Sequence, residues 1–433
     1  MNTFSLWLLF RKRSAGANDP QKLTAVLAVI AFAVTTAVSM IVVGGWHAFT
    51  LRAEGATGDI TFYPSLAAIA SMLLLVPLST LGAAAARLAM ARRDERLALL
   101  RLSGATTTQV SALTLFEACS QALLGGLIGL VGYIGLIPVV QLVVFQQRPF
   151  TFDELLLPWW AFPVGLLVVV GIAALSSGAS LRKVTISPLG VANRVNPPPL
   201  HWSRIVPLIL VVAAFTVAFK TGKAGTAVLA VFFALGFAFL NLVGPLCLML
   251  IGHVWASRAK TAHSLIGARR LIDNPKTAWR SVGGVGLATF IAGVAAVASS
   301  LANLEDDATY LTDVGTGGVL TLVIAAVVAA VSTGVMQAGR VIDQRNEYRM
   351  LALAGMDIST MNKARMRETQ VPLLTAVGLS TIVLAFFVAP VFSANIFVDP
   401  TVLVVFGASL VAAVGLVMAG VATSSRVVKI VLS

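Results

Sequence analysis

The most regular feature of this sequence is a succession of long apolar stretches separated by shorter polar segments. Most of these stretches reach the roughly 20 residues that a helix needs to cross the hydrocarbon core of a bilayer. The alternating pattern of a membrane β-strand, which extends over about ten residues, does not recur along the chain. We therefore predict an all-α, polytopic integral membrane protein with about ten transmembrane helices, at residues 22–45, 63–86, 113–145, 158–181, 205–219, 224–251, 280–303, 317–339, 370–395 and 401–425.

The composition supports this class of protein. Of the residues, 58% are hydrophobic and only 11% are charged, whereas a soluble chain of 433 residues would need more polar surface. Cys119 and Cys247 both fall in predicted spans, so we interpret them as small packing residues and not as a disulfide. The apolar run that follows the basic segment 11–13 is too long for a cleaved signal sequence, and we interpret it as the first membrane helix.

A formal net charge of +13 would suit a nucleic-acid-binding protein, but the positions of the charges indicate otherwise. If the N-terminus faces the cytoplasm, nearly all of the 31 Lys and Arg residues fall on the cytoplasmic side of the predicted helices. Those on the outer side are Arg52, Arg148, Lys220 and Lys223. This distribution follows the positive-inside rule, so the basic charge reports topology. We expect both termini in the cytoplasm and no nucleic-acid partner.

Two polar segments inside this apolar chain resemble each other. "LLRLSGATTTQVSALTLFE" at 99–117 aligns without gaps with "MLALAGMDISTMNKARMRE" at 350–368, so that Gly104 meets Gly355 and Glu117 meets Glu368. An amphipathic basic segment also precedes the first and the seventh predicted helix. Six helices separate the two starts, so the copies share one orientation and form a parallel repeat. We predict a 4+2+4 arrangement, with a first four-helix unit at 1–195, two linking helices at 196–257 and a second unit at 258–433.

The length of the helix before each polar segment predicts where that segment lies. Residues 64–102 would form a helix of about 58 Å at 1.5 Å per residue, whereas the hydrocarbon core measures about 30 Å. The helix is therefore expected to extend into the cytoplasm, and residues 317–354 are expected to do the same. Gly104 and Gly355 suit the C-terminal end of a helix. Thr106 and Asp357 then suit the N-cap of the helix that returns to the membrane.

The cytoplasmic ends of these two long helices, together with the polar segments that follow them, resemble a known protein family. "RRDERLALLRLSGATTTQV" followed by Glu117 is similar to the FtsX-like permeases, the membrane subunits of type VII ABC transporters (the MacB, LolC and BceB group). "QRNEYRMLALAGM" followed by Glu368 is a looser match. Arg96 stands where the family tends to have glutamate, whereas Glu347 keeps the expected place. The resemblance implies a bacterial cytoplasmic membrane protein that docks two copies of a separate cytoplasmic ABC ATPase. Our first hypothesis is the export of a hydrophobic or amphipathic compound along a path between the two halves that is accessible to membrane lipid.

The resemblance also implies which residues contact the ATPase. They are Arg96, Leu97, Leu100, Arg101, Gly104 and Ala105 in the first copy, and Glu347, Tyr348, Leu351, Gly355 and Met356 in the second. Glu117 and Glu368 at the start of the following membrane helices are candidate coupling carboxylates, either in a structural ion pair with a nearby loop arginine or in the transmission of motion. ATP and Mg would be bound through the partner ATPase, and we expect no directly bound cofactor and no metal.

The sequence offers little enzyme chemistry of its own. It lacks the Gly-x-x-x-x-Gly-Lys-Ser/Thr phosphate loop, so we expect no ATP hydrolysis by this chain. The most acidic outer feature, formed by residues 305–307 and Asp313, is interpreted as a solvated loop, with attraction of a cationic substrate as the alternative. Two other functions stay open. An ion-coupled secondary transporter usually has ionisable residues near the membrane midplane, whereas the predicted spans are nearly free of them. A mechanical or sensory FtsX-like subunit usually has a large extracytoplasmic domain, whereas the outer loops predicted here are short.

Overall fold

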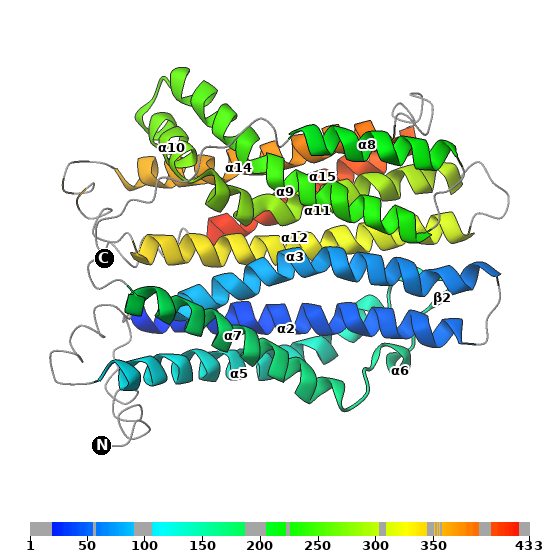
Figure 1. The fold of residues 1–433 in the computed structure, drawn as a ribbon, viewed down its shortest axis with the longest axis horizontal. Coiled ribbons are helices and arrows are strands. Elements are labelled where there is room, and N and C mark those ends of the chain that lie inside the picture. The colour runs from blue at the N-terminus through cyan, green and yellow to red at the C-terminus, as the bar shows by residue number, and fades with distance from the viewer. Residues whose placement is uncertain are drawn as a thin grey trace.

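A computed structural model of the protein describes a bundle of long helices (Figure 1). The described residues are 20–54, 58–90, 106–186, 205–221, 226–302, 309–343, 350, 353, 355, 357–388 and 400–423. The long helices are α2 (Pro20–Ala53), α3 (Tyr63–Met90), α5 (Thr107–Val140), α7 (Ala161–Ile186), α8 (Ile205–Lys220), α9 (Thr226–Ser257), α11 (Pro275–Ala302), α12 (Thr309–Asp343), α14 (Ile358–Val388) and α15 (Pro400–Thr423). The shorter elements are η1 (Gly58–Phe62), β1 (Val144–Phe145), β2 (Arg148–Pro149), α6 (Phe152–Leu155) and α10 (Ala262–Asp273).

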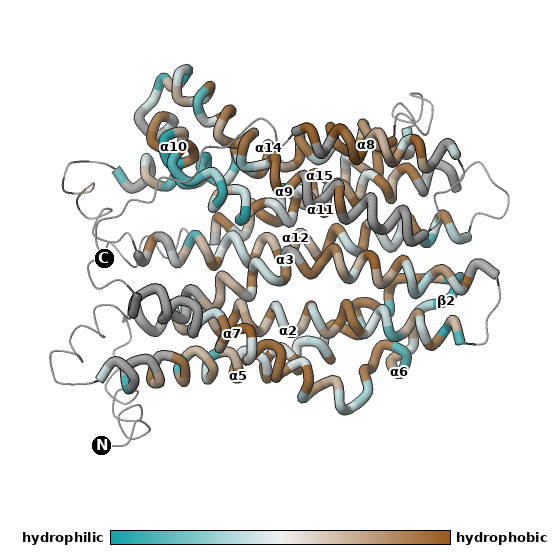
Figure 2. Tube along the Cα trace, viewed as in Figure 1, coloured by the Kyte–Doolittle hydropathy of each residue, from teal (hydrophilic) through white to brown (hydrophobic). Residues whose placement is uncertain are grey.

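The predicted class, an all-α polytopic membrane protein, is confirmed. Within the described residues, eight helices are long and apolar enough to cross a membrane, and α7 and α8 contain shorter apolar stretches. Each predicted span overlaps one helix of the structure. Hydrophobic residues follow the lengths of the helices, whereas α10 is largely hydrophilic (Figure 2). A membrane favours such a surface, because the hydrocarbon core accommodates apolar side chains and tolerates only backbone groups that are hydrogen-bonded within the protein.

Several predicted boundaries were wrong. The third span was expected to reach residue 145, but α5 ends at Val140 and a β-hairpin of β1 and β2 follows. The outer loop expected before residue 317 is helical from Thr309, and α2 continues to Ala53 beyond its predicted end at 45. The bundle therefore has an outer end, defined here by the hairpin and α6, that is built from more ordered structure than hydropathy indicated. The opposite end, which carries α10, is called the inner end.

Helices of the two predicted four-helix units make corresponding contacts. In the first unit α2 packs on α3 and α5, and α7 packs on α3 and α5. In the second unit α11 packs on α12 and α14, and α15 packs on α12 and α14. The units meet where α3 lies beside α12, with reciprocal contacts of α2 with α12 and of α3 with α11 (Figure 1). The linking helices α8 and α9 pack on the second unit. The assignment of 1–195 and 258–433 as repeated units stays a prediction.

Small residues allow the closest of these helix contacts. A Cβ atom added at Gly125 of α5 would lie 2.6 Å from the Cβ of Phe32, and one added at Gly129 would lie 2.5 Å from the carbonyl oxygen of Ala33. The two glycines are four residues apart and therefore lie on one face of α5, against α2. Membrane helices associate through such close backbone approach because lipid offers no hydrophobic driving force between them.

Candidate functional site

Most residues of the predicted ATPase contact lie outside the described part of the chain. These are Arg96, Leu97, Leu100, Arg101, Gly104, Ala105, Glu347, Tyr348, Leu351 and Met356. Gly355, Glu117 and Glu368 are described, as are the expected capping residues Thr106 and Asp357. The contact with an ATPase stays a prediction at all of these positions.

The described residues have the expected local geometry at Gly355 and at the start of both returning helices. Gly355 has a φ of +86°, in the left-handed region that favours glycine. Asp357 directly precedes α14, and its carbonyl oxygen accepts hydrogen bonds from the N–H groups of Thr360 and Met361. Thr106 caps α5, because its hydroxyl accepts from the Gln109 N–H and its own N–H donates to the Gln109 side chain. Both returning helices therefore begin at a defined residue.

The two candidate carboxylates lie farther along their helices than expected. Because α5 begins at Thr107 and α14 at Ile358, Glu117 and Glu368 are each about three turns from the helix N-terminus. Stabilisation by the helix dipole acts within the first turn, so it does not explain these carboxylates. Glu368 instead lies 3.6 Å from a guanidinium nitrogen of Arg270 on α10. The partner arginine expected in a loop is therefore on a helix.

This α10 helix is the amphipathic segment expected before the seventh predicted span. Its apolar Leu271 is buried, and the Trp255 indole of α9 donates a 2.7 Å hydrogen bond to Ser264. Beside Glu368 on α14, the Thr369 hydroxyl accepts from the Gln337 amide of α12 at 2.9 Å. The third turn of α14 thus contacts α10 through Glu368 and α12 through Thr369.

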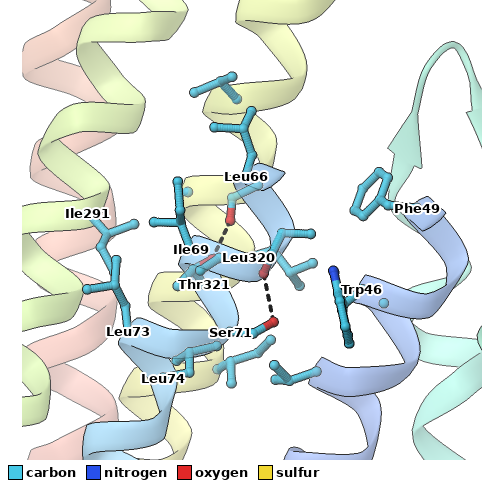
Figure 3. Close-up of a pocket in the computed structure, with 18 of the residues that line it drawn as sticks. Trp46, Phe49, Leu66, Ile69, Ser71, Leu73, Leu74, Ile291, Leu320 and Thr321 are labelled. Carbon is cyan, nitrogen blue, oxygen red and sulfur yellow. Dashed lines mark hydrogen bonds between the residues drawn. The ribbon is translucent and has the colours of Figure 1, made fainter. Parts of the chain in front are cut away.

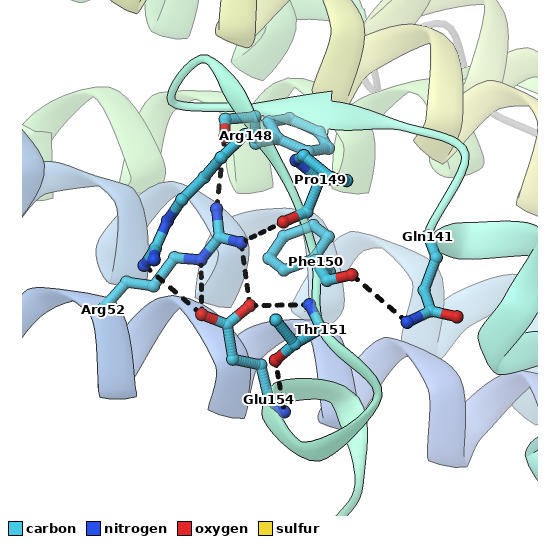
Figure 4. A network of polar contacts seen from close by, with 8 residues as sticks. Arg52, Gln141, Arg148, Pro149, Phe150, Thr151 and Glu154 are labelled. Atoms are coloured by element: carbon cyan, nitrogen blue, oxygen red, sulfur yellow. Dashed lines mark hydrogen bonds and ion pairs between the residues drawn. The ribbon is translucent and has the colours of Figure 1, made fainter.

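The outer end is organised around a buried arginine (Figure 4). The Arg52 side chain of α2 is 1% exposed and donates to both carboxylate oxygens of Glu154, at 3.1 and 2.8 Å. It also donates to the carbonyl oxygens of Phe145 and Pro149, at 3.1 and 2.8 Å. The guanidinium lies 4.3 Å from the centre of the Phe150 ring. This arrangement fixes the hairpin and α6 on the end of α2.

Glu154 makes further polar contacts with Thr151 and Arg148. It forms a capping box with Thr151 at the start of α6, and a guanidinium nitrogen of Arg148 lies 3.3 Å from its Oε1 atom. Burial raises the pKa of Glu154, but the hydrogen bonds and positive charges of Arg52 and Arg148 and the Thr151 N–H outweigh this, so the pKa lies below its ordinary value of 4.5. The sequence placed Arg52 and Arg148 outside the membrane but did not indicate this network.

Asp313 is not in a solvated loop, which corrects the sequence interpretation. It lies in the second turn of α12 and is 7% exposed. Its Oδ2 atom accepts hydrogen bonds from the Tyr63 hydroxyl of α3, at 2.6 Å, and from the Gln146 N–H of the hairpin, at 2.8 Å. Gln146 and Gln147 both have positive φ, the geometry of a two-residue hairpin turn. Asp313 therefore joins α12, α3 and the hairpin. Residues 305–307 of the acidic feature lie outside the described residues.

Beside Asp313 a partly open cavity of about 290 Å³ lies between α2, α3, α11 and α12, where the two units meet. Trp46 and Phe49 of α2 face Leu66 and Leu320 of the neighbouring helices across it (Figure 3). Most lining residues are apolar, and among the described residues that line the cavity only Asp313 is of a charged type. The cavity thus has an apolar interior and one acidic group at its outer end.

Comparison with known families matches residues 68–189 to the FtsX-like permease C-terminal domain. This range contains most of α3, the first polar turn, α5, the hairpin and α7. Comparisons with curated proteins and with solved structures gave no match. The matched range lies within the first of the two predicted units, and it includes the segment on which the resemblance was identified.

Proposed function

We propose that this chain, which carries an FtsX-like permease domain and is a membrane permease component of an ABC-type system, exports a hydrophobic or amphipathic compound. Two copies of a separate cytoplasmic ATPase would dock at the helix turns near 92–117 and 343–368. The observation that carries the proposal is the left-handed turn at Gly355, which leads directly into α14 in the segment aligned with the family-matched turn. A defined turn at the start of α14 would give an ATPase a surface on which to act.

The contacts of α14 supply a route for the motion. A force on the Gly355 turn acts along α14, whose third turn contacts α10 through Arg270 and α12 through Gln337. Helix α12 lies beside α3 at the junction of the two units and lines the cavity. Movement of the turn would therefore change the spacing of the helices around the cavity. ATP binding and hydrolysis stay with the ATPase, because this chain lacks a phosphate loop.

We place the protein in the bacterial cytoplasmic membrane with the inner end and both termini in the cytoplasm. The basic residues Arg258, Lys260, Arg269 and Lys276 gather on and around α10 at the inner end. At the outer end the buried Arg52 is paired with Glu154. This asymmetry follows the positive-inside rule and supports this orientation in the membrane.

The direct experiment first asks whether a Walker-motif ATPase is encoded beside this chain, then co-expresses the two and analyses the purified complex by native mass spectrometry. We expect one permease chain with two ATPases. Gly355→Val should lower ATP-dependent transport because valine is strained at positive φ, and charge reversal at Arg101 should have a similar effect. Asp153→Asn, an exposed change at the outer end, is the matched control. A chain that binds no ATPase and transports on an ion gradient alone would contradict the proposal.

A further inference from the structure

The carboxylate at the outer end of the cavity has neutral hydrogen-bond donors. Asp313 accepts from the Tyr63 hydroxyl and from the Gln146 N–H. Of the described ion pairs, which involve Glu154 and Glu368, none includes Asp313. Two neutral donors solvate a carboxylate but do not balance its charge, and burial of an unbalanced charge is unfavourable. A cation in the adjoining space would offset that cost.

Aromatic rings surround this carboxylate. Tyr63 stacks on Phe49 with ring centroids 5.7 Å apart, and Tyr310 meets Tyr63 edge to face at 5.7 Å. Phe145 meets Phe49 edge to face at 5.3 Å. All of these rings line the cavity together with Asp313. Aromatic faces attract cations, and most strongly cations that shed their water easily, such as quaternary ammonium or phosphonium groups.

The remainder of the cavity has little to offer a polar or anionic ligand. Its walls carry aliphatic side chains such as Leu73 and Ile291. The hydroxyl groups of Ser71 and Thr321 donate to carbonyl oxygens one turn back in their own helices, at 2.7 Å each. Intrahelical bonding of this kind satisfies the hydroxyl hydrogen. The volume of about 290 Å³ is near the lower end of the range for small-molecule sites.

From these observations we propose that the cavity between the two units binds amphiphilic monocations. The cationic centre lies toward Asp313 and the tyrosine rings, and its apolar substituents occupy the space between α3, α11 and α12. This inference names the class of compound that the proposed function leaves open. It rests on the proposed function only for the transport of that compound, since binding itself requires no ATPase.

The test is equilibrium binding of radiolabelled tetraphenylphosphonium to the full-length permease in lipid nanodiscs, without ATPase. We expect saturable binding above that of empty nanodiscs. Asp313→Asn keeps the size of the side chain and an oxygen acceptor for Tyr63 but removes the charge, so it should weaken binding by about tenfold or more. Asp153→Asn removes one exposed carboxylate at the same end and should leave binding unchanged. Tetraphenylborate, an anion of the same shape, should not compete.

A second variant keeps the carboxylate and fills the cavity. Gly317 lies one helical turn from Asp313 and lines the cavity, and a Cβ atom there would come no closer than 3.7 Å to Phe145. Gly317→Leu should therefore fold and weaken binding of tetraphenylphosphonium. If Asp313→Asn does not fold, binding of tetraphenylphosphonium to Gly317→Leu tests the inference.

Absence of saturable binding to wild type, or undiminished binding in the folded variants, would overturn the inference. So would equal competition by tetraphenylborate. None of these results would affect the ATPase complex. Conversely, loss of that complex would contradict the proposed function and leave the binding result intact.

Discussion

Two ion pairs at opposite ends of the bundle differ in almost every physical respect. At the outer end the Arg52–Glu154 pair has a shortest contact of 2.8 Å, and the arginine side chain is 1% exposed. At the inner end Arg270 and Glu368 are 3.6 Å apart, and the arginine side chain is 30% exposed. The outer guanidinium also donates to two backbone carbonyl oxygens.

The difference distinguishes an ion pair that fixes the structure, called the anchor here, from an ion pair that can break easily. A buried, bidentate pair with additional hydrogen bonds fixes geometry, and breaking it is costly because a desolvated charge is left behind. A longer, partly exposed pair contributes little to stability and can open at small cost. In our account the outer end is held fixed, and the inner end, where the ATPase would act, retains freedom to move.

The largest effect is expected from removal of the outer arginine. Arg52→Ala leaves Glu154 and two hairpin carbonyl oxygens without their buried donor, so the free energy of unfolding should fall by about 3 kcal/mol. The measurement is a denaturant titration of the protein in bicelles. Arg148→Ala is the matched control, because its side chain is 58% exposed and should contribute less than about 1 kcal/mol. Equal losses in the two variants would remove the distinction between anchor and surface pair.

A second outer contact should follow in size. The buried Tyr133 hydroxyl donates to the Leu155 carbonyl oxygen at 2.6 Å and accepts from the Leu157 N–H at 3.0 Å. Tyr133→Phe leaves both backbone groups without this partner and should lower the free energy of unfolding by about 1–3 kcal/mol. The same titration measures it. A loss of only a few tenths would mean that water replaces the hydroxyl and that this loop is not held by it.

The acid dependence of stability should come partly from Glu154. Its pKa is lower in the folded protein than the ordinary 4.5, so its contribution is fully present above that value and is lost as the pH falls through the folded pKa. The free energy of unfolding should therefore decline below about pH 4.5. Glu154→Gln should reduce that slope while lowering stability at neutral pH. An unchanged slope in this variant would assign the acid sensitivity to other groups.

The smallest effect on stability is expected at the inner pair. Arg270→Gln should change the free energy of unfolding by less than about 1 kcal/mol, because the pair is long and partly exposed. It should nevertheless reduce ATP-dependent transport, since α10 and α14 are linked there. Parallel measurement of unfolding and transport separates the two effects. Strong destabilisation together with normal ATP-dependent transport would contradict the account, because the inner pair would then fix the structure and not take part in transport.

Hydropathy and spacing predicted the helices because each signal is local. A stretch of about 20 apolar residues has few alternatives to a membrane helix. Of the two aligned glycines, Gly355 marked a left-handed turn, whereas Gly104 lies outside the described residues. The family-matched segment was likewise identified from residues 92–117. Local signals, however, carry no information on how distant segments meet.

The outer end shows this limit. The hairpin turn is formed by Gln146 and Gln147, which lack the Asn-Gly signal of such turns, and their positive φ values are accompanied by the hydrogen bond to Asp313. Asp313 was grouped with the acidic residues 305–307 and therefore interpreted as part of a solvated loop. In the structure it accepts a hydrogen bond from the Tyr63 hydroxyl in the interior. The cavity depends on four helices from both units, so no single segment indicates it.

The most direct test of the central claim, that an ATPase drives the two helix turns, is a distance measurement between them. Ala112 and Lys363 occupy aligned positions of the predicted repeat and are both exposed, so spin labels can be attached to cysteines introduced there after replacement of Cys119 and Cys247 by alanine. Pulsed electron paramagnetic resonance would compare the complex in the ADP state with the complex trapped by vanadate during ATP hydrolysis. We predict that the distance distribution shifts by more than its width between the two states. An identical distribution in both states, in a complex that hydrolyses ATP, would contradict the account.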